Sequence, residues 1–303
     1  MAEWMNDLQK KQWRTFTRNR IAVIGMFLSL GMLLMAVFAP QLSPFDPLAQ
    51  DIHMRLHAPD GPFVLGTDDF GRDVLSRIFW GARISLTIGI GSVLFGMVLG
   101  SAMGMLAGLR GGRLGAFIMR CADTMMCFPA EILAILILVV LGQGVDKMLI
   151  TIGLVMTPRF ARLSYGSTLA LREREFIEAD LALGASTLYV LRQGILPNIM
   201  GELLVMSSLW AATAIRVEAN LSFLGMGVSP PTPTWGNMVR EGIEHLSTAP
   251  WLSFAPGLAI MATVLGLTLL GDGMRDVMDP KLQGSGAPAW NEPERLRNPI
   301  LGP

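Results

Sequence analysis

The first part of this chain contains a run of 20 residues without a charge, IAVIGMFLSLGMLLMAVFAP, from Ile21 to Pro40. At a rise of about 1.5 Å per residue, a helix over this run extends about 30 Å, which matches the hydrocarbon thickness of a bilayer. A cleaved signal peptide would have a shorter apolar core, of about 7–15 residues, before a small-residue cleavage site. The run therefore predicts an uncleaved membrane-spanning helix.

Further apolar stretches predict five more spans, and composition supports a membrane protein. Only 16% of the residues are charged, whereas soluble domains carry about 25%. The fourth stretch is the weakest, because its apolar run stops at Thr157-Pro158-Arg159. The five stretches are Ile84–Leu109, Phe117–Leu141, Met148–Leu163, Leu203–Leu224 and Trp251–Leu270. We expect an all-α integral membrane protein with six transmembrane helices.

Lys and Arg side chains select the orientation, because they gather on the cytoplasmic side of a membrane. Most of them precede the first stretch or lie in the connections after the second, fourth and sixth stretches. Both chain ends are therefore predicted to be cytoplasmic. The predicted organisation is a cytoplasmic segment over 1–20, a first helix over 21–40, a periplasmic segment over 41–82, a five-helix core over 83–276 and a cytoplasmic tail over 277–303.

Glycines at every fourth position mark the second predicted span. They are Gly96, Gly100, Gly104 and Gly108, which fall on one stripe of a helix. A stripe without side chains lets another helix backbone approach closely. We expect tight helix packing there, although the sequence does not identify the partner helix.

The predicted cytoplasmic connection over 164–201 has its own helical pattern. Leu171–Leu183 consists of good helix formers, Gly184 interrupts them, and a second helix can resume at Ala185. Pro197 is expected to end that second element. The connection thus predicts a short helix, a turn and another helix.

This connection resembles the Glu-Ala-Ala loop of permease subunits of ATP-binding-cassette importers. The matching residues are Glu178-Ala179-Asp180, Gly184 and Ile195-Leu196-Pro197. Three other stretches are similar to the second, C-type permease of the dipeptide, oligopeptide and nickel uptake family. They are LGTDDFGRDVLSRIFWGARISL from Leu65, VEANLSFLGMGVSPPTPTWG from Val217 and GDGMRDVMDPKL from Gly271. The resemblance extends from about residue 10 to residue 282.

The resemblance implies a type I importer permease fold in the bacterial inner membrane. It implies four kinds of partner: a homologous second permease, two ATPase subunits, an extra-cytoplasmic binding protein and the lipid bilayer itself. It also implies that the loop couples to an ATPase. The implied coupling residues are Glu175, Glu178, Ala179, Asp180, Leu183, Gly184 and Ala185. Two positions depart from the family pattern, with Asp180 in place of Ala and Gly194 in place of the frequent Ile.

The chain contains no Gly-Lys pair, so it lacks the phosphate-binding loop of an ATPase. We expect ATP and magnesium to bind on partner subunits, with no cofactor, metal site or catalytic residue in this chain. His53 and His57 have a spacing that suits metal ligation in a helix, but two solvated loop histidines are the commoner arrangement. The chain is therefore predicted to be a transport subunit and not an enzyme.

Glu131, Arg216 and Glu218 are candidates to line the translocation pathway, because ionisable groups within spans avoid lipid. The alternative role is a structural polar bridge. Arg216 and Glu218 lie two residues apart, on opposite sides of a helix, so each is expected to need a partner on another element.

The favoured function is half of the pathway of an ATP-driven importer of dipeptides or oligopeptides. One alternative is the same type of importer for a nickel chelate or an opine-like metallophore. An alternative from another class is an ion-coupled secondary transporter, in which the carboxylates within the spans would carry protons or sodium.

Overall fold

The computed structural model describes residues 19–278, and every regular element in that range is helical. The all-α prediction is therefore confirmed for this range. The predicted segment over 1–20 and tail over 277–303 lie almost wholly outside the described residues. The elements are α2 (Arg20–Val37), α3 (Ala39–Leu42), η1 (Ile52–Met54), α4 (Val74–Arg110), α5 (Gly112–Met126), α6 (Ala130–Leu141), α7 (Val145–Arg172), α8 (Glu175–Ala182), α9 (Thr187–Tyr189), η2 (Val190–Ile195), α10 (Leu196–Phe223), α11 (Trp235–Ile243) and α12 (Trp251–Met278).

Four helical segments are long and apolar enough to cross a membrane. They are Arg20–Val37, Val74–Arg110, Thr187–Phe223 and Trp251–Val277, and the bent pair α5 and α6 would raise the number to five. Helix α7 has the length of a span, but the segment from Pro158 to Arg162 includes two arginines. Six spans therefore stay a prediction.

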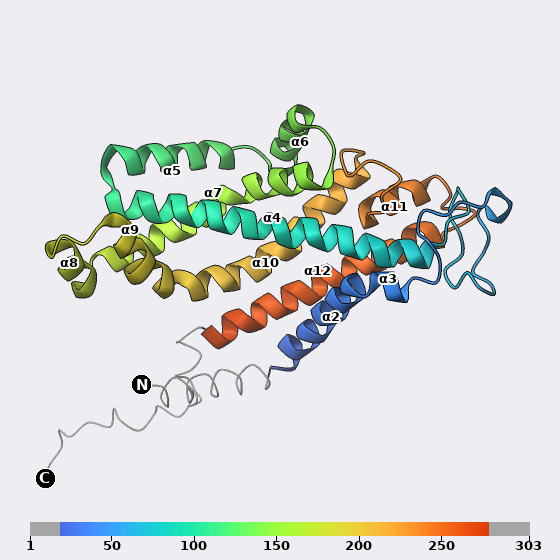
Figure 1. The fold of residues 1–303 in the computed structure, drawn as a ribbon, viewed down its shortest axis with the longest axis horizontal. Coiled ribbons are helices and arrows are strands. Elements are labelled where there is room, and N and C mark those ends of the chain that lie inside the picture. Colours follow the sequence, from blue (N-terminus) through green and yellow to red (C-terminus); the bar gives the residue numbers. More distant parts are fainter. Residues whose placement is uncertain (1–18, 279–303) are drawn as a thin grey trace, which may run out of the picture.

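The third predicted span, over Phe117–Leu141, is two helices and not one. Helices α5 and α6 meet at an angle of 99°. The break falls at Cys127–Pro129, where Pro129 has an extended backbone (ψ 135°) and becomes the N-cap of α6. Proline disfavours the helical conformation in the preceding residue, so a helix tends to end before it. Figure 1 shows α6 beyond the end of α5, turned sharply out of the direction of α5.

The glycine stripe packs against α7, which confirms the predicted close approach and identifies the partner helix. A Cβ on Gly100 would lie 2.3 Å from the carbonyl oxygen of Thr157, and one on Gly104 would lie 2.2 Å from that of Ala161. These gaps admit no side chain. The two backbones therefore touch along this stripe, and α4 and α7 run side by side through the bundle (Figure 1).

Helix α2 packs against α12 by the same means. A Cβ on Gly25 would lie 2.5 Å from the backbone nitrogen of Leu270, and one on Gly266 would lie 2.9 Å from Cβ of Leu28. The rest of α2 is mainly exposed, including Phe27 at 64%. Such a face suits contact with lipid, since water would penalise so much apolar surface.

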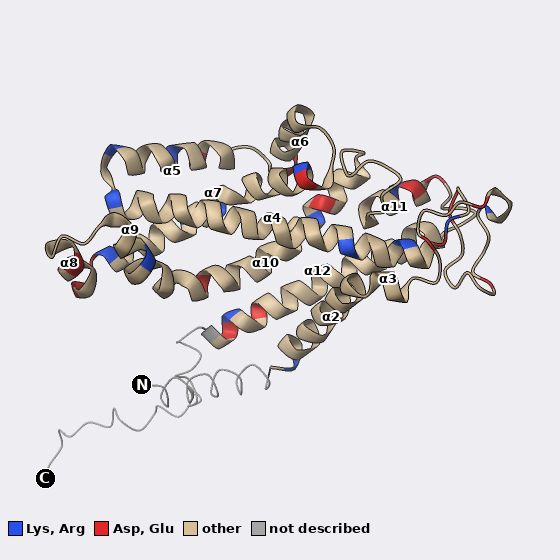
Figure 2. Ribbon diagram, in the orientation of Figure 1, with Lys and Arg blue, Asp and Glu red and all other residues tan. Residues whose placement is uncertain are grey.

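The long helices place short elements at two opposite ends of the bundle. One end carries α8, α9 and η2, and we call residues 173–195 the α8 end. The other carries α3, η1 and α11, and we call residues 40–77 and 224–250 the α11 end. Figure 2 shows charged residues at both ends, and long uncharged stretches of α2, α4, α10 and α12 between them.

Candidate functional site

The predicted coupling residues form one short helix and the turn after it. Helix α8 begins with Glu175 in its first turn, and carries Glu178 and Ala179 on its exposed surface. Asp180 and Ala185 are half-buried at the base of the turn, where the Ala185 N–H donates to the Asp180 carbonyl oxygen at 3.0 Å. The predicted pattern of helix, turn and helix is therefore present.

A single side chain anchors α8 to the rest of the chain. Ile177 is the one buried residue of this helix and is 0% exposed. Its Cδ1 atom would lie 2.5 Å from a Cβ on Gly194 in η2, so a larger residue there would require the end of the Ile177 side chain to move. The departure from the family pattern at Gly194 thus has a steric reason in this chain: the Ile177 side chain fills the space that a larger residue would need.

Several large apolar side chains are exposed at the α8 end, beside exposed charged residues such as Glu175 and Glu178. Leu183 is 87% exposed, and Phe176, Leu188 and Tyr189 are exposed as well. Gly184, which ends the turn, has φ +79°, and a Cβ there would meet nothing within 4 Å. A side chain at this position would therefore strain the backbone without creating a clash. An exposed apolar surface on a small helix is typical of a docking element for a partner groove.

Pro197 does not end the second element, contrary to the prediction from sequence. It lies in the first turn of α10, and the chain is helical from Thr187 to Phe223. The preceding π-helical turn over Val190–Ile195 changes the hydrogen-bond register just before the proline.

Arg216 and Glu218 point in opposite directions from α10, as their spacing predicts. Arg216 is exposed and makes no ion pair with any other residue between 19 and 278. Glu218 is 0% exposed, and its Oε1 accepts from the Ser222 hydroxyl at 2.9 Å. Ser222 lies one turn further along the same helix, and the hydroxyl of Ser85 in α4 is a second hydrogen-bonding group for this carboxylate, so the expected partner on another element is present.

Other ionisable groups of the predicted spans have local roles. Glu131 is half-buried in the first turn of α6, where a negative charge stabilises the helix. Glu202 of α10 accepts from the Ser167 hydroxyl of α7 at 2.6 Å. Asp123 of α5 pairs with Arg162 of α7. None of the described ion pairs joins Glu131, Arg216 and Glu218, so no common site follows from their contacts.

A buried ion cluster at the α11 end was missed by the sequence reasoning. Arg72 Nε donates to Asp68 Oδ2 at 2.6 Å, and Arg77 Nε lies 3.4 Å from the same oxygen. Both guanidinium groups also reach Glu241 Oε2 of α11, at 3.3 Å and 3.0 Å. Arg77 is 1% exposed and Arg72 is 3% exposed. Two arginines and two carboxylates thus tie the start of α4 and the turn before it to a helix more than 160 residues later.

Two local features position this cluster: a tight turn at Asp68 and the N-cap of α4 at Asp73. Asp68 Oδ1 accepts from the N–H groups of Phe70 and Arg72, which closes a tight turn. Asp73 caps α4 by accepting from the Ser76 N–H at 2.8 Å. Both residues belong to the stretch from Leu65 that carries the family resemblance, and the i,i+4 spacing of Asp68 and Arg72 was the available signal. Their partner Glu241 has no such local signal.

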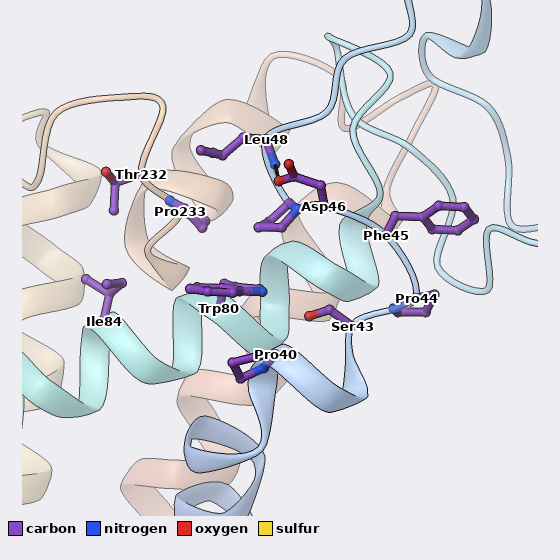
Figure 3. Close-up of a pocket in the computed structure, with 11 residues that line it drawn as sticks. Pro40, Ser43, Pro44, Phe45, Asp46, Leu48, Trp80, Ile84, Thr232 and Pro233 are labelled. Carbon is purple, nitrogen blue, oxygen red and sulfur yellow. Dashed lines mark hydrogen bonds between the residues drawn. The ribbon is translucent and has the colours of Figure 1, made fainter.

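The α11 end also contains an apolar hollow of about 720 Å³. Figure 3 shows Trp80 and Ile84 of α4 along one side, with Phe45, Leu48 and Pro233 around them. The only ionisable residue in its lining, Asp46, already accepts from the Leu48 N–H at 2.9 Å. This hollow therefore suits apolar groups, with one carboxylate at its edge.

The two histidines of the predicted periplasmic segment do not form a metal site with other ligands. His53 lies in η1, and His57 Nδ1 lies 2.8 Å from the Ala58 carbonyl oxygen. Residues 19–278 contain no group of three or more His, Cys, Asp or Glu side chains that could hold a metal ion.

Comparison with known proteins identifies the family. Residues 96–284 match the model of the binding-protein-dependent transport system inner membrane component, and residues 9–59 match the N-terminal TM domain of oligopeptide transport permease C. A chain from inward-facing structures of the MetNI methionine ABC transporter has a TM-score of 0.53 at 21% identity, and the match covers 68% of this chain and 97% of that one. This likeness supports the type I importer permease fold.

Three relatives match along almost the whole chain. The di/tripeptide transport system permease DppC of Pseudomonas aeruginosa is 39% identical, with 91% of this chain and 93% of that protein covered. The oligopeptide permease OppC of Bacillus subtilis is 37% identical over 91% of each chain. The glutathione permease GsiD of Pectobacterium atrosepticum is 39% identical, with 89% and 90% covered. The chain therefore belongs to the binding-protein-dependent transport system inner membrane components and is a C-type permease subunit of a bacterial inner-membrane ABC importer.

Proposed function

We propose that this chain forms half of the pathway through which an ATP-driven importer moves short peptides into the cytoplasm. The observation that carries the proposal is the match, over about nine-tenths of the chain, to permeases that are named for dipeptides, tripeptides and oligopeptides. The chain would pair with a homologous permease, receive peptides from an extra-cytoplasmic binding protein, and rely on two ATPase subunits that hold ATP and magnesium.

In this proposal the α8 end is cytoplasmic, the α11 end is periplasmic, and α7 and the bent pair α5 and α6 complete six spans. Both chain ends are then on the cytoplasmic side. The proposed orientation places the exposed surface of α8 where an ATPase can bind it. Glu175, Glu178, Ala179, Asp180, Leu183, Gly184 and Ala185 form the proposed coupling segment.

The exposed charge of Arg216 fits a position along the pathway, with α10 facing the second permease. Glu131 is a weaker candidate for the pathway, since it also stabilises the start of α6. Glu218 is proposed as a structural group in this conformation, because its carboxylate is fully buried. The proposed movement is a displacement of α8 by the ATPase, which α7 and α10 transmit as tilts of the spans on either side.

The experiment is peptide uptake into proteoliposomes that contain the complete transporter. In the variant Leu183→Asp, a charge replaces a side chain that is 87% exposed, so the fold should be retained. We expect uptake and binding of the ATPase subunits to fall at least tenfold. The matched control is Ile52→Asp, which changes an equally apolar residue, 78% exposed, at the opposite end.

Uptake that survives Leu183→Asp would overturn the coupling role of α8. Uptake by this chain without ATPase subunits, abolished by a protonophore, would overturn the importer and support an ion-coupled transporter instead.

A further inference from the structure

A second hollow at the α11 end differs from the apolar one because charged side chains line it. Its volume is about 420 Å³, within the range of roughly 300–1,000 Å³ that small-molecule sites occupy. Four separate segments form its wall: the turn at Asp69, the α6–α7 connection at Gln143, the loop from Gly225 to Pro230, and α11 with the residues that follow it.

Hydrogen bonds between uncharged groups fix the wall of this hollow, and its charged side chains take no part in them. Gln143 Nε2 donates to the Gly225 carbonyl oxygen at 2.9 Å, and the Ser229 hydroxyl donates to Gln143 Oε1 at 2.8 Å. Asn237 Nδ2 donates to the Val228 carbonyl oxygen at 2.7 Å. The loop is thus fixed between α6–α7 and α11, and the hollow is preformed.

Two side chains of opposite charge in the lining, Arg240 and Glu244, have no partner among the described residues. Arg240 and Glu244 are exposed, and neither side chain forms an ion pair or hydrogen bond in the part of the chain that the structure describes. The guanidinium of Arg240 lies against Gly225, where a Cβ would be 2.8 Å from Nη1. The nearby carboxylates are already occupied, since Asp69 pairs with Arg55 and His245, and Glu241 pairs with the buried arginines. One free cation and one free anion remain.

The geometry points to this hollow as a site for the charged ends of a short peptide. This inference rests on the proposed function, and it places the entry of the peptide at the outer ends of α6, α7 and α10. Arg240 binds the terminal carboxylate, for which its planar fork is suited, and Glu244 binds the terminal ammonium. One helical turn separates the two residues, with Cβ atoms about 5–6 Å apart, and an extended peptide of two or three residues spans about 7–11 Å.

The test uses the complete transporter with its binding protein, trapped with ATP and vanadate. The probe is a tripeptide with free ends and a photoreactive diazirine on its middle side chain. We expect the probe to label residues 225–245 of this chain. Arg240→Gln and Glu244→Gln should each reduce the labelled fraction about tenfold, because each removes a charge-assisted hydrogen bond. Neither change leaves a buried charge unpaired, so both variants should fold.

The matched control is Asp60→Asn, which changes an exposed carboxylate on the same end of the molecule, outside the hollow. Its labelling should equal that of the wild type. The exchange variant, with Arg240→Glu and Glu244→Arg together, retains both charges and should restore labelling to within about threefold by binding the peptide in the reverse direction. A surface that docked the binding protein would not be restored by this exchange.

Labelling outside residues 225–245, or unchanged labelling in both single variants, would overturn the site. Loss of binding-protein capture in both variants, without recovery in the exchange variant, would overturn it in favour of a docking surface. A wild-type transporter whose ATP hydrolysis does not respond to peptide-loaded binding protein would contradict the proposed function itself, which separates the two failures.

Discussion

The α8 end and the α11 end are both built from short helices, but different forces hold them. At the α11 end, Asp68 and Glu241 pair with two arginines that are almost completely buried. At the α8 end, Ile177 alone anchors the helix, and none of the described ion pairs involves residues 173–195. A part with one apolar anchor can move as a unit, whereas a buried network of charges fixes its position. The difference fits a movable coupling element opposite a rigid outer frame.

The largest expected effect comes from breaking the rigid end. Asp68→Asn would remove the carboxylate that Arg72 and Arg77 share, and leave buried positive charge in excess. Losing one partner of a buried ion pair costs about 3–5 kcal/mol. We expect the melting temperature of the purified chain in detergent to fall sharply.

The control for Asp68 is Arg55→Gln, which breaks the more exposed pair with Asp69. Exposed pairs contribute about 0–1 kcal/mol, so the melting temperature should hardly change. Equal effects of the two variants would contradict the difference in burial on which the comparison depends.

A smaller and local effect is expected at the movable end. Ile177→Ala should cost about 2–5 kcal/mol of side-chain packing, because the isoleucine is fully buried against Gly194. The loss should fall on α8 alone. We expect faster amide hydrogen exchange over Glu175–Ala182 with an unchanged melting temperature for the whole chain. Global unfolding at a much lower temperature would show that α8 is part of the rigid core.

The smallest effect tests the connection between the two ends. Gly100→Ala should cost about 1–3 kcal/mol, because its methyl group would overlap the Thr157 carbonyl oxygen. The control is Gly166→Ala in α7, where a Cβ meets nothing within 4 Å and alanine favours the helix. Both variants can be compared by melting temperature and by peptide uptake. A loss of stability in Gly166→Ala as large as that in Gly100→Ala would argue against backbone contact between α4 and α7.

Patterns local in the sequence predicted most of the fold. Long apolar runs gave the positions of α2, α4, α10 and α12, and the glycine stripe gave close packing. The break at Pro129 was missed because apolar residues continue on both sides of it. The hydropathy pattern therefore predicts one continuous span. The position of Pro197 was misjudged because a proline can end one helix or begin the next, and its sequence neighbours fit both.

The two ends differ in how far the sequence could describe them. The proposed coupling segment is local, so Glu178 and Gly184 indicated its helix and its turn. The ion cluster depends on Glu241, which folding brings to Arg72 and Arg77 from far along the chain. The hollow between Gln143 and Arg240 is likewise made by distant segments. Apart from the i,i+4 spacing of Asp68 and Arg72, sequence spacing carries no signal for either arrangement.

The most direct test of the account is amide hydrogen exchange of this chain within the complete transporter, compared with the same chain without its ATPase subunits. The account predicts strong additional protection over residues 175–189 when the ATPases are bound, with no change over residues 66–77 and 235–245. Unchanged exchange over residues 175–189 would contradict it, because the α8 end would then not be the surface that the ATPases grip.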